Sequence, residues 1–484
     1  MNQQTTPAEA YPAIIGGERV FTNAAIEVLD PATGRAFATV ARCGQEEVDR
    51  AVAAARKAYS ETWRLTTAAE RARLLTRFAG VIAAHGEELA ALECRDTGKP
   101  LSQAKIDLSF AVRYFEYYSN MVEALFGSVI PAATDRLTFT MREPYGVTGH
   151  IIPWNYPLGI ASRTLAPALA AGNCCVLKPA EQAPLSSVRI AELALEAGFP
   201  PGVLNVVPGY GAEAGAALSG HPGIDHVSFT GSVSVGRTIA TAAAQNLVPA
   251  ALELGGKSPN IVLADADLDL AAPVVARAIL QNAGQTCSAG ARLLVHRDIH
   301  RELVARLKDI FARTTIGAGS ADPDLGPVIS ALQHQRVGEL VDIGKGEAEL
   351  VHGGGRPAGR AYGDGYFFEP TLFDNVAADA AIAQREIFGP VLTVTPFGDL
   401  DEAVALANGT DYGLVAGVWT RNIGRANWLL RELYCGQVMV NTFSNGVELP
   451  FCGRKKSGYG VEKGFEALLA FTHVKGAVVM MGKD

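Results

Sequence analysis

The sequence has few aromatic residues, few charged residues and no dense cluster of basic residues. Aromatic residues make up 7% and charged residues 19% of its 484 positions, and 50 acidic against 42 basic residues give a net charge of −8. This composition disfavours nucleic-acid binding through neutralisation of a phosphate backbone. The hydrophobic fraction of 48% instead indicates a globular protein with large buried layers.

The sequence also lacks a long apolar run of the kind that crosses a membrane. Its most apolar long window, residues 151–172, contains Arg163 and three prolines. The start, MNQQTTPAEAYP, has no basic segment followed by an apolar one, so we expect no signal peptide and interpret residues 1–12 as a flexible arm. The seven cysteines are odd in number and irregularly spaced, which favours the reducing cytoplasm over a disulfide framework.

A chain of this length is too long for one ordinary core, and its pattern predicts an α/β protein of two or three units. A hairpin is expected around Asp30–Gly34, and helices over about 45–59, 67–93 and 101–126. From residue 145, strand-like segments such as GVTGHII and CCVLK alternate with helix-like ones, and a second such region follows Glu253. This alternation predicts doubly wound parallel sheets covered by helices on both faces.

A carboxylate and a thiol frame the most informative stretch of the chain. Glu253 precedes the strand-like PNIVLA and a helical pattern, and Cys287 follows Gly284, which we expect to end that helix. We therefore expect a strand-and-helix crossover that brings Glu253 and Cys287 to one end of one sheet. A thiol facing a carboxylate across a cleft indicates covalent catalysis, in which the sulfur attacks and the carboxylate moves protons.

The glycine pattern GxGxxG of many dinucleotide-binding proteins is missing. Gly231 and Ser232 instead stand at a strand-to-helix turn, where a helix N-terminus can face a pyrophosphate. Taken alone, this turn is a weak signal, because many turns between strands and helices look like it.

Seven segments in order resemble the aldehyde dehydrogenase superfamily, over about residues 23–472. They are PWNYP (153–157), LKPAEQAP (177–184), FTGS (229–232), LELGGKSP (252–259), GQTCSAG (284–290), EIFGPV (386–391) and KSGYG (456–460). The resemblance implies an NAD(P)-dependent, non-acylating enzyme with two doubly wound domains and a projecting oligomerisation hairpin.

The resemblance also implies a division of the chain. A dinucleotide-binding domain is expected at 1–127 and 144–252, and a catalytic domain at 253–435. Oligomerisation elements are expected at 128–143 and about 468–484, giving a homodimer or homotetramer, and 436–467 should return to the cofactor domain and the substrate tunnel. An ordinary surface hairpin is the alternative interpretation of 128–143.

Three residues match the catalytic positions of the superfamily. Cys287 would be the nucleophile and Glu253 the general base, while Asn155 and the backbone N–H of Cys287 would stabilise the oxyanion. Two of them have structural alternatives: Asn155 as the N-cap of a helix, and Glu253 as a charge at a strand end. The remaining six cysteines are interpreted as small buried hydrophobic residues.

The cofactor site implied by the resemblance binds NAD. Glu181 would accept hydrogen bonds from the adenosine ribose and repel a 2′-phosphate, although the neighbouring Lys178 leaves NADP as an alternative. The expected cofactor residues are Ile152, Pro153, Trp154, Lys178, Glu181, Gly231, Ser232, Leu254, Glu386 and Phe388. No metal is expected.

The substrate residues inferred from the sequence are Tyr156, Arg163, Gln281 and Phe451. Arg163 stands on an otherwise apolar helix, either as a salt-bridged arginine or as a clamp for a substrate carboxylate. Succinate-semialdehyde dehydrogenases resemble the chain in this arginine, but their second carboxylate-binding arginine is Gln281 here. The match favours a semialdehyde or another polar aldehyde, without fixing which. Cys452 stands at a position where the superfamily usually has a glycine.

Three other functions compete with this interpretation. A CoA-acylating dehydrogenase needs no hydrolytic base, so the presence of Glu253 argues against it. A non-catalytic protein with the same fold has no need for Cys287, Glu253 and Asn155 together. A thiol esterase would turn over esters without NAD.

Overall fold

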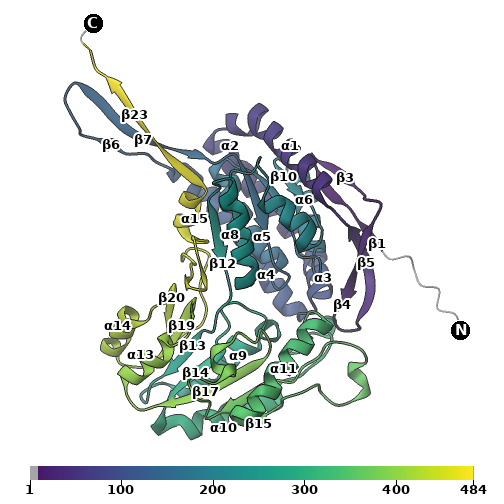
Figure 1. Ribbon diagram of the computed structural model, residues 1–484, viewed down its shortest axis with the longest axis vertical. Coiled ribbons are helices and arrows are strands. Elements are labelled where there is room, and N and C mark those ends of the chain that lie inside the picture. The colour runs from purple at the N-terminus through teal and green to yellow at the C-terminus, as the bar shows by residue number, and fades with distance from the viewer. Residues whose placement is uncertain (1–8, 483–484) are drawn as a thin grey trace, which may run out of the picture.

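The computed structural model describes residues 9–482 and contains two large, mostly parallel sheets (Figure 1). The first has eight strands, in the order β22 (Gly458–Tyr459), β12 (Ala250–Glu253), β11 (His226–Thr230), β8 (Val147–Ile151), β9 (Cys174–Lys178), β10 (Leu204–Val206), β2 (Ala13–Ile15) and β3 (Glu18–Val20). Its central strands β8, β9 and β11 are buried along their whole length, as expected for parallel strands covered on both faces. The helices packed on it include α1 (Gln45–Glu61), α5 (Pro157–Ala171), α6 (Leu185–Glu196) and α8 (Val233–Gln245).

The second sheet has seven strands. They are ordered β15 (Glu349–His352), β16 (Thr371–Asp374), β17 (Val391–Phe397), β14 (Arg292–His296), β13 (Pro259–Val262), β19 (Val415–Trp419) and β20 (Gln437–Val440). The helices of this half of the chain are α9 (Leu268–Leu280), α10 (His300–Arg313), α11 (Ala331–Glu347), α12 (Ala381–Gln384), α13 (Leu400–Asn408) and α14 (Ile423–Glu432). Because β20 pairs with β19, this sheet extends beyond the boundary expected at residue 435.

The two sheets change the predicted relation between Glu253 and Cys287. Glu253 is the last residue of β12 in the first sheet, whereas β13, α9 and β14 all belong to the second half of the molecule. The prediction that a crossover brings both residues to one end of one sheet is therefore wrong. The chain passes from one sheet to the other within residues 254–258, and the two groups approach each other between the sheets.

The helical region before residue 127 contains one more break than the periodicity indicated. The helix expected over 67–93 is divided at His85 into α2 (Ala68–Ala84) and α3 (Gly86–Thr97), followed by α4 (Leu101–Met121). A Cβ atom at Gly86 would lie 2.9 Å from the Leu108 side chain on α4, so glycine permits the close approach of α3 to α4. The expected hairpin is present as β4 (Ala25–Asp30) and β5 (Arg35–Ala41).

Strands lie at or near both ends of the described chain. Glu9–Tyr11 form β1, which pairs with β5, so the flexible arm predicted for residues 1–12 is wrong for these three positions, and residues 1–8 lie outside the described residues. Near the other end, β23 (Thr472–Met480) pairs along β7 (Arg136–Pro144), which also pairs with β6 (Val129–Ile130). This three-stranded sheet projects from the body of the molecule (Figure 1).

The remaining elements are short. They are α7 (Ala216–Ser219), α15 (Gly464–Ala470), β18 (Tyr412–Gly413) and β21 (Arg454–Lys455). Over residues 9–482, no helix combines the length and the apolar character that a membrane crossing requires.

Candidate active site

Cys287 lies in the loop between α9 and β14, and an unusual turn shapes this loop. Asn282, Ala283 and Gly284 have consecutive positive φ angles of 50°, 53° and 73°, so α9 ends before Gly284 rather than at it. A Cβ atom at Gly284 would overlap the carbonyl oxygen of Gly389. The loop therefore packs backbone to backbone against the EIFGPV segment, which holds the thiol in place.

Two glycines bring the end of β12 close to the same loop. A Cβ atom at Gly256 would lie 2.5 Å from the carbonyl oxygen of Cys287, and one at Gly255 would overlap the Glu386 carboxylate. The structure thus supports the close backbone approach expected for this glycine pair. Glu253, two residues before Gly255, is thereby brought near Cys287 although the two residues belong to different sheets.

The Glu253 carboxyl group is buried without a hydrogen-bond partner. The residue is 2% exposed, and neither carboxyl oxygen is bonded within residues 9–482. Burial raises its pKa well above the ordinary value, the nearby Glu462 raises it further, and Arg163 opposes both effects. A carboxylate whose pKa is raised in this way is a stronger base than an ordinary glutamate, which suits a general base.

Asn155 is held rigidly between β8 and α5. Its backbone carbonyl oxygen accepts hydrogen bonds from Lys99 Nζ at 3.0 Å and Asn282 Nδ2 at 2.8 Å. Its side-chain Nδ2 donates to the backbone carbonyl oxygen of Gln285 at 2.9 Å. The N-cap of α5 is Tyr156, so the alternative interpretation of Asn155 as the N-cap is wrong. One Nδ2 hydrogen of Asn155 remains for a ligand.

A cavity of about 220 Å³ brings together most of the predicted catalytic and substrate residues. Its lining includes Asn155, Tyr156, Arg163, Gln281, Cys287 and Phe451. Tyr156 joins the nucleophile loop through its hydroxyl group, which lies 2.7 Å from Thr286 Oγ1 and accepts a hydrogen bond from Gln281 Nε2 at 3.2 Å. Cys452 is only partly buried; this burial raises the pKa of its thiol, and the Glu253 carboxylate raises it further.

The charges around the thiol act in opposite directions. Burial raises the pKa of Cys287 to about 11; Arg163 opposes this shift, whereas Glu253 and other carboxylates add to it. The group at rest is therefore a thiol, and a nearby positive charge favours its reactive thiolate form.

Arg163 forms a buried ion pair with Glu462, a residue that the sequence analysis did not select. Their side chains are 9% and 4% exposed, and Arg163 Nε contacts Glu462 Oε2 without the alignment of a hydrogen bond. The guanidinium also lies 5.2 Å from the ring centre of Phe451. The structure supports the interpretation of Arg163 as a salt-bridged arginine, although its side chain also lines the cavity.

Lys99 is a second functional residue that the sequence analysis did not select, because the segment Thr97–Pro100 around it looks like a simple helix break. The side chain is 1% exposed, and Nζ donates to Asp107 Oδ2 at 2.5 Å as well as to the Asn155 carbonyl oxygen. The contact with Asn155 spans 56 positions of sequence, and no local pattern signals such a pairing.

The predicted cofactor residues lie at the carboxyl ends of parallel strands in the first sheet. Ile152, Pro153 and Trp154 follow β8, Lys178 ends β9, Gly231 and Ser232 open α8, and Leu254 follows β12. Lys178 Nζ donates to Glu181 Oε2 at 3.2 Å, and the Ser232 side chain accepts a hydrogen bond from the Val235 N–H at 3.4 Å. Carboxyl ends of parallel strands are where open α/β sheets bind their ligands, so these residues fit a dinucleotide.

Glu386 and Phe388 reach the same region from the second half of the chain. Glu386 Oε1 accepts a hydrogen bond from the Gly256 N–H at 3.0 Å, and burial raises the pKa of this glutamate to about 7. Phe388 meets Trp154 edge to face, with ring centres 5.3 Å apart. The expected ribose and nicotinamide residues therefore border both the cofactor residues and the loop that follows Glu253.

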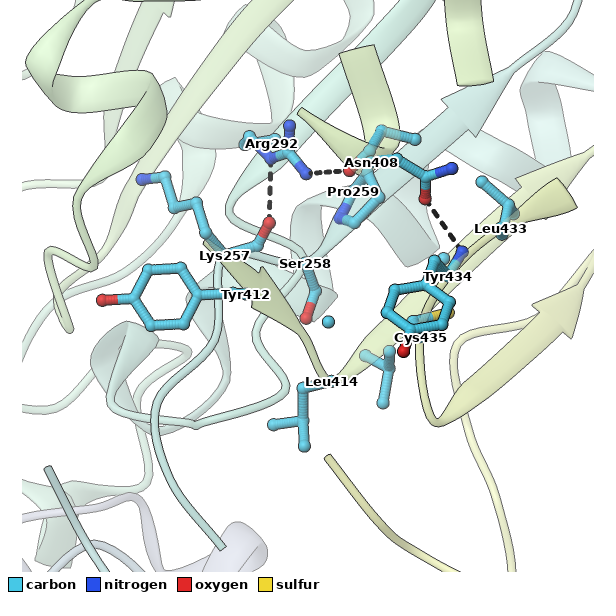
Figure 2. A pocket seen from close by; sticks show the side chains of 14 residues that line it. Lys257, Ser258, Pro259, Arg292, Asn408, Tyr412, Leu414, Leu433, Tyr434 and Cys435 are labelled. Atoms are coloured by element: carbon cyan, nitrogen blue, oxygen red, sulfur yellow. Dashed lines mark hydrogen bonds between the residues drawn. The ribbon is translucent and has the colours of Figure 1, made fainter. Parts of the chain in front are cut away.

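A second, very small cavity of about 10 Å³ lies beside the segment after Glu253 (Figure 2). Arg292 lines it and donates to the carbonyl oxygens of Lys257 at 2.8 Å and Ala407 at 2.8 Å. Burial and the charge of Arg292 lower the pKa of Lys257 to about 7. The volume is too small for an organic ligand, so these contacts anchor the segment between the two sheets.

Comparison with known proteins agrees with the geometry. The profile of the aldehyde dehydrogenase family matches residues 20–477. The chain belongs to the aldehyde dehydrogenase family. This membership confirms the predicted family, the fold class and the class of enzyme, an NAD-dependent oxidoreductase that acts on aldehydes.

Individual relatives differ in their named substrates. The chain is 43% identical to hydroxyisobutyraldehyde dehydrogenase of Mycolicibacterium austroafricanum, over 94% of this chain and 90% of the relative. It is 42% identical to human retinal dehydrogenase 2, over 93% and 88%. A Bacillus cereus aldehyde dehydrogenase solved with NAD+ superimposes with a TM-score of 0.96 at 42% identity, over 98% and 97%. These similarities do not select one aldehyde.

The Arg163–Glu462 pair makes a prediction about stability. Arg163→Leu should lower the free energy of unfolding by about 3–5 kcal/mol, because Glu462 then remains buried without its cation. The double variant Arg163→Leu/Glu462→Gln should recover most of this loss, since no buried charge remains. Urea denaturation followed by fluorescence measures both effects.

An exposed ion pair provides the matched control. Arg113 lies 2.6 Å from Glu448, with side chains 43% and 52% exposed, so Arg113→Leu should cost at most about 1 kcal/mol. Equal losses for Arg163→Leu and Arg113→Leu would show that the buried pair has no special role.

Proposed function

We propose that Cys287, Asn155 and Glu253 carry out the oxidation of an aldehyde to a carboxylic acid through a thioester on Cys287. The observation that carries this proposal is the position of the thiol. Cys287 lines a cavity with Asn155, and its backbone touches Gly256 in the segment that follows Glu253. A nucleophile, an oxyanion donor and a base thus converge from three parts of the sequence.

In the first step, the sulfur of Cys287 attacks the aldehyde carbonyl carbon to form a thiohemiacetal. The positive charge of Arg163 favours the thiolate, opposing the effect of burial on the thiol pKa. The free Nδ2 hydrogen of Asn155 and the backbone N–H of Cys287 stabilise the negative charge that develops on the carbonyl oxygen. The fixed position of Asn155 keeps this donor oriented without further rearrangement.

The described residues fit NAD. Ser232 caps the N-terminus of α8, which would face the pyrophosphate, Glu181 and Lys178 would hold the adenosine ribose, and Glu386 would hold the nicotinamide ribose. When bound, NAD supplies the electron acceptor that converts the thiohemiacetal to the thioester. The carboxylate of Glu181 would repel a 2′-phosphate, which favours NAD over NADP.

In the last step, Glu253 takes a proton from the water that hydrolyses the thioester. Its carboxyl oxygens have no competing partner within residues 9–482, and its raised pKa makes its carboxylate a stronger base than an ordinary glutamate. This role supports water rather than CoA as the acceptor of the acyl group, because transfer to CoA needs no such base.

The domain roles follow from these assignments. The first sheet would bind the dinucleotide, and the second would supply the nucleophile. The sheet of β6, β7 and β23 would join subunits into a homodimer or homotetramer, because Val129, Val474, Val478 and Met480 expose apolar side chains on it. Light scattering counts the subunits, and a monomeric mass would contradict this role.

The seven unpaired cysteines support a reducing compartment such as the cytoplasm.

The variant Glu253→Gln tests the assigned base. Acylation and the first NADH release should persist while hydrolysis slows, so a burst of NADH near one equivalent per active site should precede a slow steady state. Cys287→Ala, the matched control, should give neither burst nor steady state. Stopped-flow absorbance of NADH measures both phases. A single-turnover rate reduced as strongly as the steady state would instead place Glu253 on the thiol.

The same variant also tests whether Glu253 causes the pH dependence of thioester hydrolysis. Because the pKa of Glu253 is raised, its basic form is scarce at low pH and increases as pH rises. Thioester hydrolysis in the wild type should therefore keep accelerating as the pH rises above the range in which an ordinary glutamate titrates, and Glu253→Gln should lose this dependence.

Glu181 tests the preference for NAD. Glu181→Ser should raise kcat/KM with NADP relative to NAD by about tenfold or more, because repulsion of the 2′-phosphate disappears while Lys178 remains. Glu302→Ser, which removes an exposed acid paired with Arg306 on α10, serves as the control. An unchanged ratio in Glu181→Ser would remove Glu181 from the ribose site.

A further inference from the structure

Lys463 places an ammonium group in the wall of the substrate cavity without an acidic partner. Lys463 directly follows Glu462 in the sequence. The residue is 8% exposed and lines the cavity. Within residues 9–482, no carboxylate lies at ion-pair distance from its Nζ. The two acids whose charges act on it are already paired, Glu462 with Arg163 and Glu448 with Arg113. Lys463 is thus a buried cation whose counter-charge is not supplied by the protein.

A directed chain of hydrogen bonds fixes the one hydrogen bond that the Lys463 side chain makes within the described residues. Gln437 Nε2 donates to the carbonyl oxygen of Pro450, so the Gln437 amide oxygen is left to accept from Asn445 Nδ2 at 2.6 Å. Asn445 Oδ1 must then face Lys463, and it accepts from Nζ at 2.8 Å. Since the Pro450 carbonyl can only accept, the whole chain is oriented to hold the ammonium group in place.

This single contact leaves the ammonium group incompletely satisfied. A lysine has three N–H donors, and an amide oxygen occupies one of them. The ring centre of Phe451 lies 5.6 Å from Lys463 Nζ and 5.2 Å from the Arg163 guanidinium, and the ring face offsets part of the cost of burial. Burying a charge without a counter-charge is unfavourable, so an anion entering the cavity would gain a strong interaction.

The remaining charges of the cavity point to the same ligand chemistry. Asp107, an acid in the lining, already accepts a hydrogen bond from Lys99. Arg277 on α9 lines the cavity from its solvent-exposed side and forms no ion pair within the described part of the chain. With Arg163 paired to Glu462, the two uncompensated charges of the lining are both positive.

The backbone of Lys463 is also unusual. Its φ of 59° and ψ of 174° fall in a region occupied almost only by glycine. Placing a lysine there costs conformational energy, and such strain persists mainly where a side chain has a functional position.

We infer that Lys463 binds the carboxylate of an aldehyde substrate that carries an acid group at its far end, with Arg277 attracting it from the solvent side. This inference rests on the proposed oxidation at Cys287 and moves the acid-binding role from Arg163, which is occupied by Glu462, to Lys463. The substrate class is therefore an ω-carboxy aldehyde rather than an uncharged or cationic one.

The test compares acid and neutral substrates of equal length. Initial rates of NADH formation are measured with 4-oxobutanoate, 5-oxopentanoate and 6-oxohexanoate, and with butanal, pentanal and hexanal. The wild type should have a higher kcat/KM for at least one acid than for its neutral counterpart. Lys463→Met should lower this acid-to-neutral ratio by about tenfold or more, equivalent to about 1.4 kcal/mol, mainly through KM. Lys456→Met, which removes an exposed lysine paired with Asp411, should leave the ratio unchanged.

Two outcomes would overturn the inference. One is a wild-type preference for every neutral aldehyde over its acid, and the other is an acid-to-neutral ratio unaffected by Lys463→Met. If Lys463→Met does not fold, competition on the wild type decides: glutarate should inhibit pentanal oxidation competitively and neutral glutaramide should not, and equal inhibition would contradict the role. Oxidation of neither substrate series would overturn the proposed function itself, whereas good oxidation of neutral aldehydes alone would overturn only the role of Lys463.

Discussion

Close backbone contact between two loops is the constraint on which the site depends. The segment after β12 reaches the backbone of Cys287 because Gly256 has no side chain, and the nucleophile loop reaches the EIFGPV segment because Gly284 has none. Any side chain at either position would push apart the loops that carry the base and the thiol. The base Glu253 and the thiol of Cys287, which come from different sheets, are thereby brought together between the two sheets.

The second feature is a group of ionisable side chains in a poorly solvated space. Burial raises the pKa values of both Cys287 and Glu253, so it disfavours the charged, reactive form of each group. Arg163 opposes both shifts, and Glu462 holds Arg163 in place while adding to the shift of Glu253. Because such interactions are strong at low dielectric, small displacements within this group would change the reactivity of the thiol and of the base together.

Much of the architecture could be predicted from the sequence, because burial on both faces of a parallel sheet leaves recognisable apolar strands. The positions of β8, β9, β11 and α5 follow from this pattern. The change of sheet after Glu253 could not be predicted, since a strand that leaves one sheet and a strand that enters another have the same composition. Lys99, Glu462 and Lys463 were missed for a related reason: their contacts depend on distant parts of the chain, and a charged residue in a sequence gives no sign that it is buried.

The most direct test of the account is to trap the acyl group on the enzyme. Glu253→Gln mixed with an aldehyde and NAD, quenched in acid within the burst phase and digested, should yield a peptide containing Cys287 with the added mass of the acyl group, as measured by mass spectrometry. The mass should disappear on treatment with hydroxylamine, which cleaves thioesters. An acyl group on Cys452 or another cysteine, or a full NADH burst without any acylated peptide, would contradict the assignment of Cys287 as the nucleophile.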